Sequence, residues 1–130
     1  MKLSKLTDYS LVLLSRLAVE KELQTARGLS QKTAIPEPTV AKLMKALVKQ
    51  DIVSSVRGSN GGYRLAIDAS NISAARVIEA IEGPIELTQC VTANTGSCIL
   101  EGSCHLSGRW EKINGAVKSA LEEISLKDLA

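Results

Sequence analysis

Three cysteines in the second half of the chain are the residues best suited to chemistry. Cys90, Cys98 and Cys104 are separated by seven and five residues, and the single histidine, His105, follows the third directly. An odd number of thiols does not suit a disulfide framework. Structural zinc normally uses a tight C-x2-4-C pair, which is missing here, although three thiolates and one further ligand can still bind the ion. Iron-sulfur ligation tolerates this looser spacing, and three ordinary thiols without a metal remain the alternative.

The segment that carries these thiols must be positioned by the elements on either side of it. From Pro84 to His105 the sequence has little periodicity and is rich in Thr, Gly, Ser and Asn, and loops of this length usually have a function. Before it, Ser73 is expected to cap a short helix that ends at Gly83-Pro84 and has an apolar face of Val77, Ile78 and Ile81. A long helix is expected after it, over about 106–124.

The expected C-terminal helix has a heptad-like apolar seam. Its residues recur at steps of four, three, four, four and three: Leu106, Trp110, Ile113, Val117, Leu121 and Ile124. The seam can pack on the protein's own core, but we favour a contact between two copies of the chain. In a DNA-binding protein, a two-fold dimer would place two recognition helices one turn of duplex apart, and palindromic half-sites would then be expected.

The first half of the chain has the pattern of a helix-turn-helix. A buried helix is expected over about 4–22, with Leu6, Leu13, Leu14 and Leu17 at helical spacing, and a short helix over 26–33. The two prolines of Ala34–Pro38 then force a turn. An amphipathic helix is expected from Thr39 to Gln50, and its free face carries Thr39, Lys42, Lys45 and Lys49. A packed helix pair with a solvated lysine face gives the same pattern.

A β-hairpin is expected directly after this helix. Residues 52–56 and 63–67 read as two short strands joined by a Gly-rich turn, in which Gly61-Gly62 permits backbone angles that other residues avoid. Arg57 and Arg64 bracket its tip with fixed positive charge. Helix, turn, basic helix and hairpin together predict a winged helix, with Thr39 and Lys42 as candidates for base edges and Arg57 for the minor groove.

The overall composition is that of a folded protein with an uneven charge distribution. The 130 residues are 45% apolar and 23% charged, with a formal net charge of +2. Residues 1–66 contain eleven Lys/Arg and five Asp/Glu (+6), whereas residues 67–130 contain five and nine (−4). No apolar run is long enough to span a bilayer and no secretory signal is present, so we expect a cytoplasmic protein. No catalytic signature occurs, so we expect neither an enzyme nor a small-molecule substrate.

Taken together, the 54–65 wing, the helix-turn-helix, Glu82-Gly83-Pro84 and the three-cysteine segment resemble the Rrf2 family of bacterial transcription regulators. The resemblance spans nearly the whole chain, and residues 3–9 and 82–90 are most similar to the branch that regulates the suf system of iron-sulfur cluster assembly. It implies that Cys90, Cys98 and Cys104 hold an iron-sulfur cluster, [2Fe-2S] or [4Fe-4S], whose state sets the affinity for operator DNA.

The fourth ligand differs between branches of this family. IscR-like members have a His separated by two residues from the third cysteine, a place that Ser107 occupies here. NsrR-like members use an N-terminal Asp of the partner subunit, and Thr7-Asp8-Tyr9 matches that motif, so Asp8 is preferred over His105. A carboxylate is a harder ligand than a thiolate, which suits a responsive site. Asp8 also suits the first turn of a helix for purely structural reasons.

The sequence thus predicts a mainly α protein with a small β-hairpin: a winged helix-turn-helix followed by a long C-terminal dimerisation helix. The expected parts are a DNA-binding domain over 1–83, a cluster loop over 84–105, and a dimerisation helix and tail over 106–130. The expected function is that of a homodimeric repressor controlled by an iron-sulfur cluster and acting on suf genes. The alternative is a repressor of the same fold that senses nitric oxide or thiol oxidation, with zinc or no metal.

Overall fold

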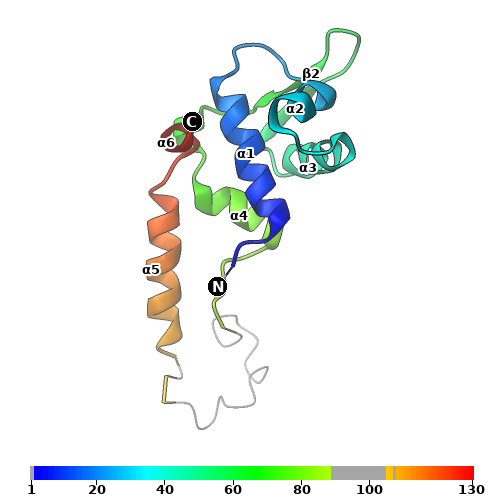
Figure 1. The fold of residues 1–130 in the computed structure, drawn as a ribbon. Coiled ribbons are helices and arrows are strands. Elements are labelled where there is room, and N and C mark those ends of the chain that lie inside the picture. Colours follow the sequence, from blue (N-terminus) through cyan, green and yellow to red (C-terminus); the bar gives the residue numbers. More distant parts are fainter. Residues whose placement is uncertain (1, 89–104, 107) are drawn as a thin grey trace.

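The computed structural model describes residues 2–88, 105–106 and 108–130, and the fold is mainly helical with one small hairpin (Figure 1). This confirms the predicted fold class. None of the described helices is long and apolar enough to cross a membrane. The elements in chain order are α1 (Lys5–Val19), α2 (Ala26–Thr33), α3 (Glu37–Lys49), β1 (Val53–Val56), β2 (Gly62–Leu65), the 3-10 turn η1 (Ala69–Asn71), α4 (Ala74–Glu82), α5 (Trp110–Glu122) and α6 (Leu126–Leu129).

Helix α1 forms the centre of the winged-helix body. Ser4 caps it by accepting a hydrogen bond from the backbone N–H of Thr7 at 3.2 Å. Its core face buries Leu13, Leu14 and Leu17, as predicted, but the prediction for Leu6 was wrong because that side chain is 36% exposed. Thr7 and Ser10 are buried in its place. They are tolerated there because their hydroxyls bond locally, that of Ser10 to the Leu6 carbonyl at 2.8 Å.

Helices α2 and α3 form the predicted helix-turn-helix. Thr25 caps α2, whose predicted bounds are confirmed, and Ala34 ends it in the left-handed region at φ 65°. Helix α3 begins at Glu37, two residues before the predicted start, because proline is compatible with a first helical turn. The apolar stripe of α3 lies in the core, where the fully or nearly fully buried residues are Val40, Leu43, Met44 and Leu47.

Strands β1 and β2 form an antiparallel hairpin that is tied to the loop before α2. Ser55 pairs with Tyr63, and Tyr63 also exchanges two backbone hydrogen bonds with Gln24, at 2.7 and 3.0 Å. Gly62 is required at this crossing: its φ is +153°, and an added Cβ would lie 2.8 Å from the Gln24 carbonyl oxygen. Strand β2 of the wing is therefore held, through Tyr63, by the loop between α1 and α2.

The C-terminal helix is shorter than the sequence pattern predicts. The expected helix over 106–124 is α5 over 110–122, because Gly108 adopts φ +76° and separates Leu106 from the helix. Ser73 caps α4 as predicted. Helix α5 packs beside α4 and stands apart from α1, α2 and α3 (Figure 1).

A short last helix, α6, was not predicted, and it returns the chain to the winged-helix body. Ser125 and Asp128 form a reciprocal capping box at its start. Leu126 is fully buried in the same core as α1 and α3, and its N–H donates to the Ile72 carbonyl at 2.9 Å. The S-x-x-D pattern was the signal that identifies this helix in the sequence.

Candidate functional site

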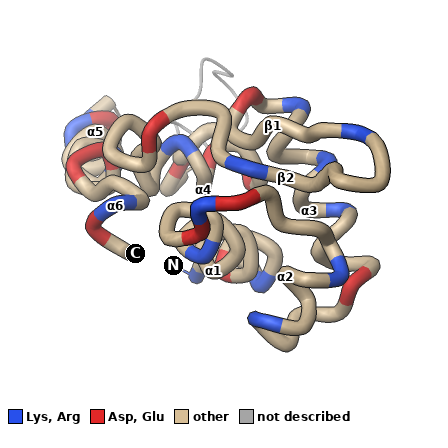
Figure 2. The backbone as a smooth tube through the Cα atoms, turned by 90° about the horizontal axis from the view of Figure 1, so that it is seen from above, with Lys and Arg blue, Asp and Glu red and all other residues tan. Residues whose placement is uncertain are grey.

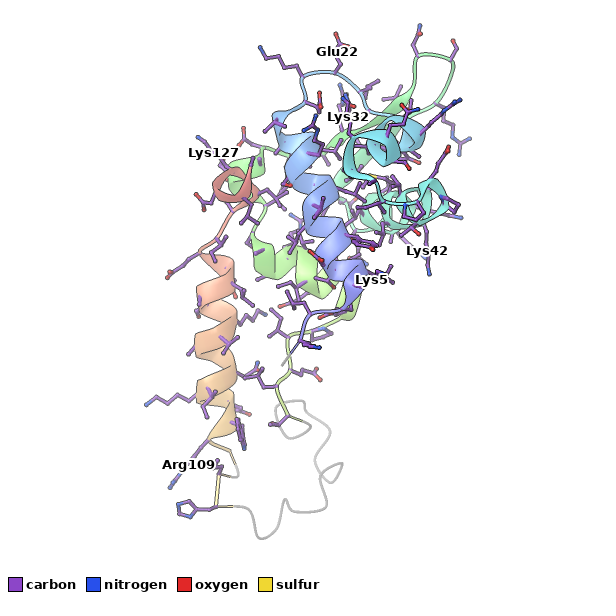
Figure 3. All side chains as sticks on the ribbon, viewed as in Figure 1. Lys5, Glu22, Lys32, Lys42, Arg109 and Lys127 are labelled. Atoms are coloured by element: carbon purple, nitrogen blue, oxygen red, sulfur yellow. The ribbon has the colours of Figure 1, made fainter. Side chains whose placement is uncertain are left out.

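The free face of α3 presents the predicted basic residues to solvent. Because Val40, Leu43, Met44 and Leu47 occupy the buried stripe, Lys42, Lys45 and Lys49 are left exposed and Thr39 is half-buried. Lys42 points outward from the helix (Figure 3). Flexible ammonium groups on an accessible helix are suited to contact the phosphates of a duplex.

The wing lies beside α3 and adds further positive charge. A groove of about 680 Å³ between the two is lined by Lys45, Arg57 and the glycines of the wing tip. The structure therefore brings Lys45 and Arg57 together. Arg64 pairs with Ser54 across the hairpin and is exposed, but strand alternation places it on the opposite face from the groove-lining Tyr63. Lys and Arg positions follow α3 and the hairpin on one side of the molecule (Figure 2).

The loop that anchors the wing is itself fixed by a polar network, which the sequence reasoning missed. Lys32 Nζ contacts both Gln24 Oε1 and Glu20 Oε1 at 2.8 Å. The hydrogen bond from Lys32 lowers the pKa of Glu20, and the charge of Arg16 lowers it by a smaller amount. Lys32 of α2 thus fixes the side chain of Gln24, whose backbone pairs with the wing.

The predicted cluster ligands are described only in part. Cys90, Cys98 and Cys104 lie outside the described residues, so the predicted ligation by them is not tested. Asp8 is exposed in the first turn of α1, and within the described ranges its carboxylate makes no hydrogen bond or ion pair. His105 is also exposed. Among the described residues, no group of three or more His, Cys, Asp or Glu is close enough to hold a metal ion.

Two side chains fix the point at which the cysteine segment leaves the body. The carboxylate of Glu82, the last residue of α4, accepts a hydrogen bond from the Ser4 N–H at 2.6 Å. Asn114 of α5 accepts from the Leu87 N–H at 2.8 Å and donates to the Ile85 carbonyl at 2.7 Å. Glu82 thus joins the end of α4 to the residue before α1, and Asn114 joins α5 to the residues that follow α4.

The link between Glu82 and Ser4 predicts a pH-dependent contribution to stability. The Ser4 N–H, followed by the hydroxyls of Ser4 and Thr7, lowers the pKa of Glu82 below its ordinary value of 4.5. A lowered carboxyl pKa stabilises the fold above the unfolded pKa, and this gain is lost as pH falls through the folded pKa. We expect Glu82→Gln to reduce the free energy of unfolding by about 0.5 kcal/mol at neutral pH. The effect is small because solvent screens the exposed interaction between the Glu82 carboxylate and the Ser4 N–H.

Urea unfolding of the Glu82→Gln variant at several pH values measures this contribution. The difference from wild type should be constant above the ordinary pKa of 4.5 and should vanish in stronger acid. Glu22→Gln is the matched control, because Glu22 is an exposed carboxylate in the loop after α1 (Figure 3). A difference that is the same at every pH would contradict the assignment.

The chain shows similarity to one protein family over almost its full length. Residues 3–130 match the Rrf2 family, described as an iron-dependent transcriptional regulator. The chain is 32% identical over 131 residues to the HTH-type transcriptional regulator NsrR of Shouchella clausii (strain KSM-K16), covering 99% of this chain and 88% of that relative. It is 32% identical over 101 residues to the HTH-type transcriptional regulator IscR of Escherichia coli O1:K1 / APEC, covering 78% and 61%. The structure of CymR, the global cysteine regulator of B. subtilis, has a TM-score of 0.78 at 27% identity and covers 100% of this chain and 96% of that chain.

Proposed function

The chain belongs to the Rrf2 family of iron-dependent transcriptional regulators, and on that premise we propose that it binds operator DNA as a homodimer whose affinity is set by an iron-sulfur cluster. Because its relatives are named transcriptional regulators, the chain is a regulator and not an enzyme. The finer proposal is that it represses genes for iron-sulfur cluster assembly of the suf type. The observation that carries DNA binding is the exposed lysine face of α3 beside a basic wing.

On DNA, α3 is proposed to enter the major groove. We propose that Lys42, Lys45 and Lys49 neutralise phosphates and that Thr39 and Lys42, near the helix start, reach base edges. Arg57 at the wing tip is proposed to reach the adjacent minor groove, and Arg64 the backbone. A duplex seated against both α3 and the wing covers the groove that Lys45 and Arg57 line.

The proposed dimer is supported by two apolar surfaces that one protomer leaves exposed. On α1, Val12 (41% exposed) and Val19 (55%) lie on the same face as Asp8, because the three are spaced by four and seven residues. On and beside α5, Ile113, Leu106 and Ile124 are exposed, whereas Trp110, Val117 and Leu121 are half-buried. The predicted seam is thus divided: Val117 and Leu121 line a groove with Ile78 of α4, and the remaining apolar residues are available to a second copy.

The proposed cluster ligands are Cys90, Cys98 and Cys104 of one protomer and Asp8 of its partner, with His105 as the second choice to Asp8. Three thiolates and one carboxylate form a donor set that suits iron, and Asp8 is exposed in the first turn of α1, whose capping residue Ser4 is bonded to Glu82 at the end of α4. When bound, the cluster supplies a redox-active centre. Because Asp8 belongs to the helix at the centre of the winged-helix body, ligation across the dimer joins the sensing end of one subunit to the DNA-reading body of the other.

The control of DNA binding is proposed to be a shift between two dimer arrangements. Couplings of this kind are typically about 1 to 3 kcal/mol, which corresponds to a change of about 5- to 150-fold in operator affinity. We propose that the chain consists of a DNA-binding domain over 1–83, a cluster segment over 84–105 and a dimerisation region over 106–130. The last helix of this third region, α6, packs back on the first.

A second candidate is a regulator of the same fold that senses nitric oxide or thiol oxidation directly, with zinc or no metal. The similarity to a structure named as a global cysteine regulator favours keeping it. Iron and acid-labile sulfide analysis of protein purified without oxygen separates the two candidates. We expect a coloured protein with iron and sulfide in equal amounts. A colourless protein that contains zinc or no metal would favour the second candidate.

A further inference from the structure

Lys32 of α2 is engaged in contacts within the protein. In a helix-turn-helix, the helix before the recognition helix crosses the DNA backbone, so a phosphate contact is the ordinary expectation for a lysine on it. Here the Nζ of Lys32 instead donates to Glu20 Oε1 and Gln24 Oε1, both at 2.8 Å, beside the loop between α1 and α2 (Figure 3). The carboxylate of Glu20 offsets the charge of the ammonium group. Lys32 is therefore directed toward that loop and is not presented to a duplex.

The partner of Lys32 in the loop, Gln24, is a buried amide whose two ends are both bonded. Gln24 is 8% exposed, and the burial of an amide is costly unless its polar atoms have partners. Its Oε1 accepts from Lys32, and its Nε2 donates to the Glu22 carbonyl at 3.1 Å. Its backbone N–H and C=O are both paired with Tyr63 of β2. Gln24 thus joins α2, through its side chain, to the wing, through its backbone.

The strand that Gln24 holds determines where Arg57 lies. Tyr63 pairs with Ser55, two residues before Arg57, and Arg57 directly follows the end of β1. Tyr63 also lines the groove of about 680 Å³ in which Lys45 and Arg57 meet. A shift of Gln24 would therefore move the wing relative to α3 and would separate the two basic surfaces.

We propose that Lys32 is a positioning residue for DNA binding, which acts through Gln24 and the wing. By fixing the Gln24 side chain, Lys32 holds β2 so that Arg57 and the lysines of α3 face the duplex together. Its own ammonium group makes no phosphate contact, because Glu20 and Gln24 occupy it. The inference rests on the proposed function, since it takes DNA binding by α3 and the wing as its premise. It predicts that Lys32 affects the affinity for DNA through Arg57.

A double-mutant cycle between Lys32 and Arg57 tests this inference, with a fluorescent random-sequence duplex as the probe. In the wild-type background, Arg57→Ala should weaken binding roughly eightfold for each bound subunit at about 0.1 M salt, because one cationic contact is lost. In the Lys32→Met background the same change should cost about threefold or less, because the wing is no longer held in place. Gln24→Met, which changes no charge, should reduce the cost of Arg57→Ala in the same way. Lys21→Met, an exposed change of equal charge in the same loop, is the matched control and should leave that cost unaltered.

Hydrogen exchange in the absence of DNA tests the structural step. Exchange at the Tyr63 and Gln24 amides, each bonded to the other's carbonyl, should be faster in Lys32→Met and Gln24→Met than in wild type, and unchanged in Lys21→Met. Unchanged exchange in the first two variants would overturn the positioning role. An equal cost of Arg57→Ala in every background would also overturn it, while leaving DNA binding by α3 in place. If the wild-type protein does not bind the duplex at all, the proposed function fails, and the inference with it.

Discussion

Replacing both Lys42 and Lys45 by alanine is expected to weaken binding to duplex DNA by about 60-fold for each bound subunit at about 0.1 M salt. Each lysine that neutralises a phosphate releases roughly 0.9 of a counterion, which is worth roughly eightfold at this salt relative to 1 M. Both side chains are exposed on α3, so the substitutions leave the buried stripe of the helix intact. Titration of a fluorescent random-sequence duplex at several salt concentrations measures the loss.

The salt dependence provides the sharper test of this prediction. The slope of log affinity against log salt should become less steep by about 1.8 for each bound subunit when the two contacts are removed. Lys112 and Lys127 are the matched control pair, because they are exposed on α5 and α6 and their removal changes the net charge equally. If the control pair lowers affinity as much as Lys42 and Lys45 do, net charge rather than the α3 face accounts for binding.

Cys90→Ala is expected to abolish iron binding and to fix the operator affinity at the value of the iron-free protein. The removed thiolate is one of the three proposed cysteine ligands, and a carboxylate and two thiolates leave one iron short of a protein ligand. The expected change from cluster-loaded wild type is about 5- to 150-fold. Iron analysis and titration of a duplex selected in vitro by the wild-type protein measure both effects on one preparation.

Two further substitutions identify the fourth ligand in the same assay. Asp8→Ala should lower the iron content or shorten the lifetime of the cluster, whereas His105→Ala should behave as wild type. Asp8 is exposed on α1, so its replacement leaves the buried residues of the described protomer in place. The reverse pattern, with His105→Ala impaired and Asp8→Ala unaffected, would assign the ligand to His105.

The elements that could be predicted from the sequence are those whose signals are local. Thr25 and the prolines after Ala34 delimit α2, and the apolar stripe of α3 leaves its lysines exposed by simple periodicity. The start of α5 was misplaced because the heptad pattern continues through Gly108, whose positive φ breaks the helix. Helix α6 was missed although its capping box is local, because it has only four residues and one buried side chain, Leu126.

The contacts that define the base of the cysteine segment could not be predicted in this way. The Glu82 carboxylate meets a backbone N–H 78 residues earlier in the chain, and Asn114 meets groups 27 and 29 residues away. Neither contact has a spacing that a helix or strand repeats. Similarly, the pairing of Gln24 with Tyr63 could not be predicted, because the sequence indicated only that Gly61 and Gly62 permit backbone angles that other residues avoid. The sequence indicated which residues are basic or thiol-bearing, but not which side chains position them.

The most direct test of the central claim is an equilibrium titration of one operator duplex with cluster-loaded and iron-free forms of the same protein preparation, at one salt concentration and without oxygen. The two dissociation constants are predicted to differ by about 5- to 150-fold. Restoring iron and sulfide to the iron-free form should return the first value. Equal dissociation constants for the two forms would contradict control by an iron-sulfur cluster.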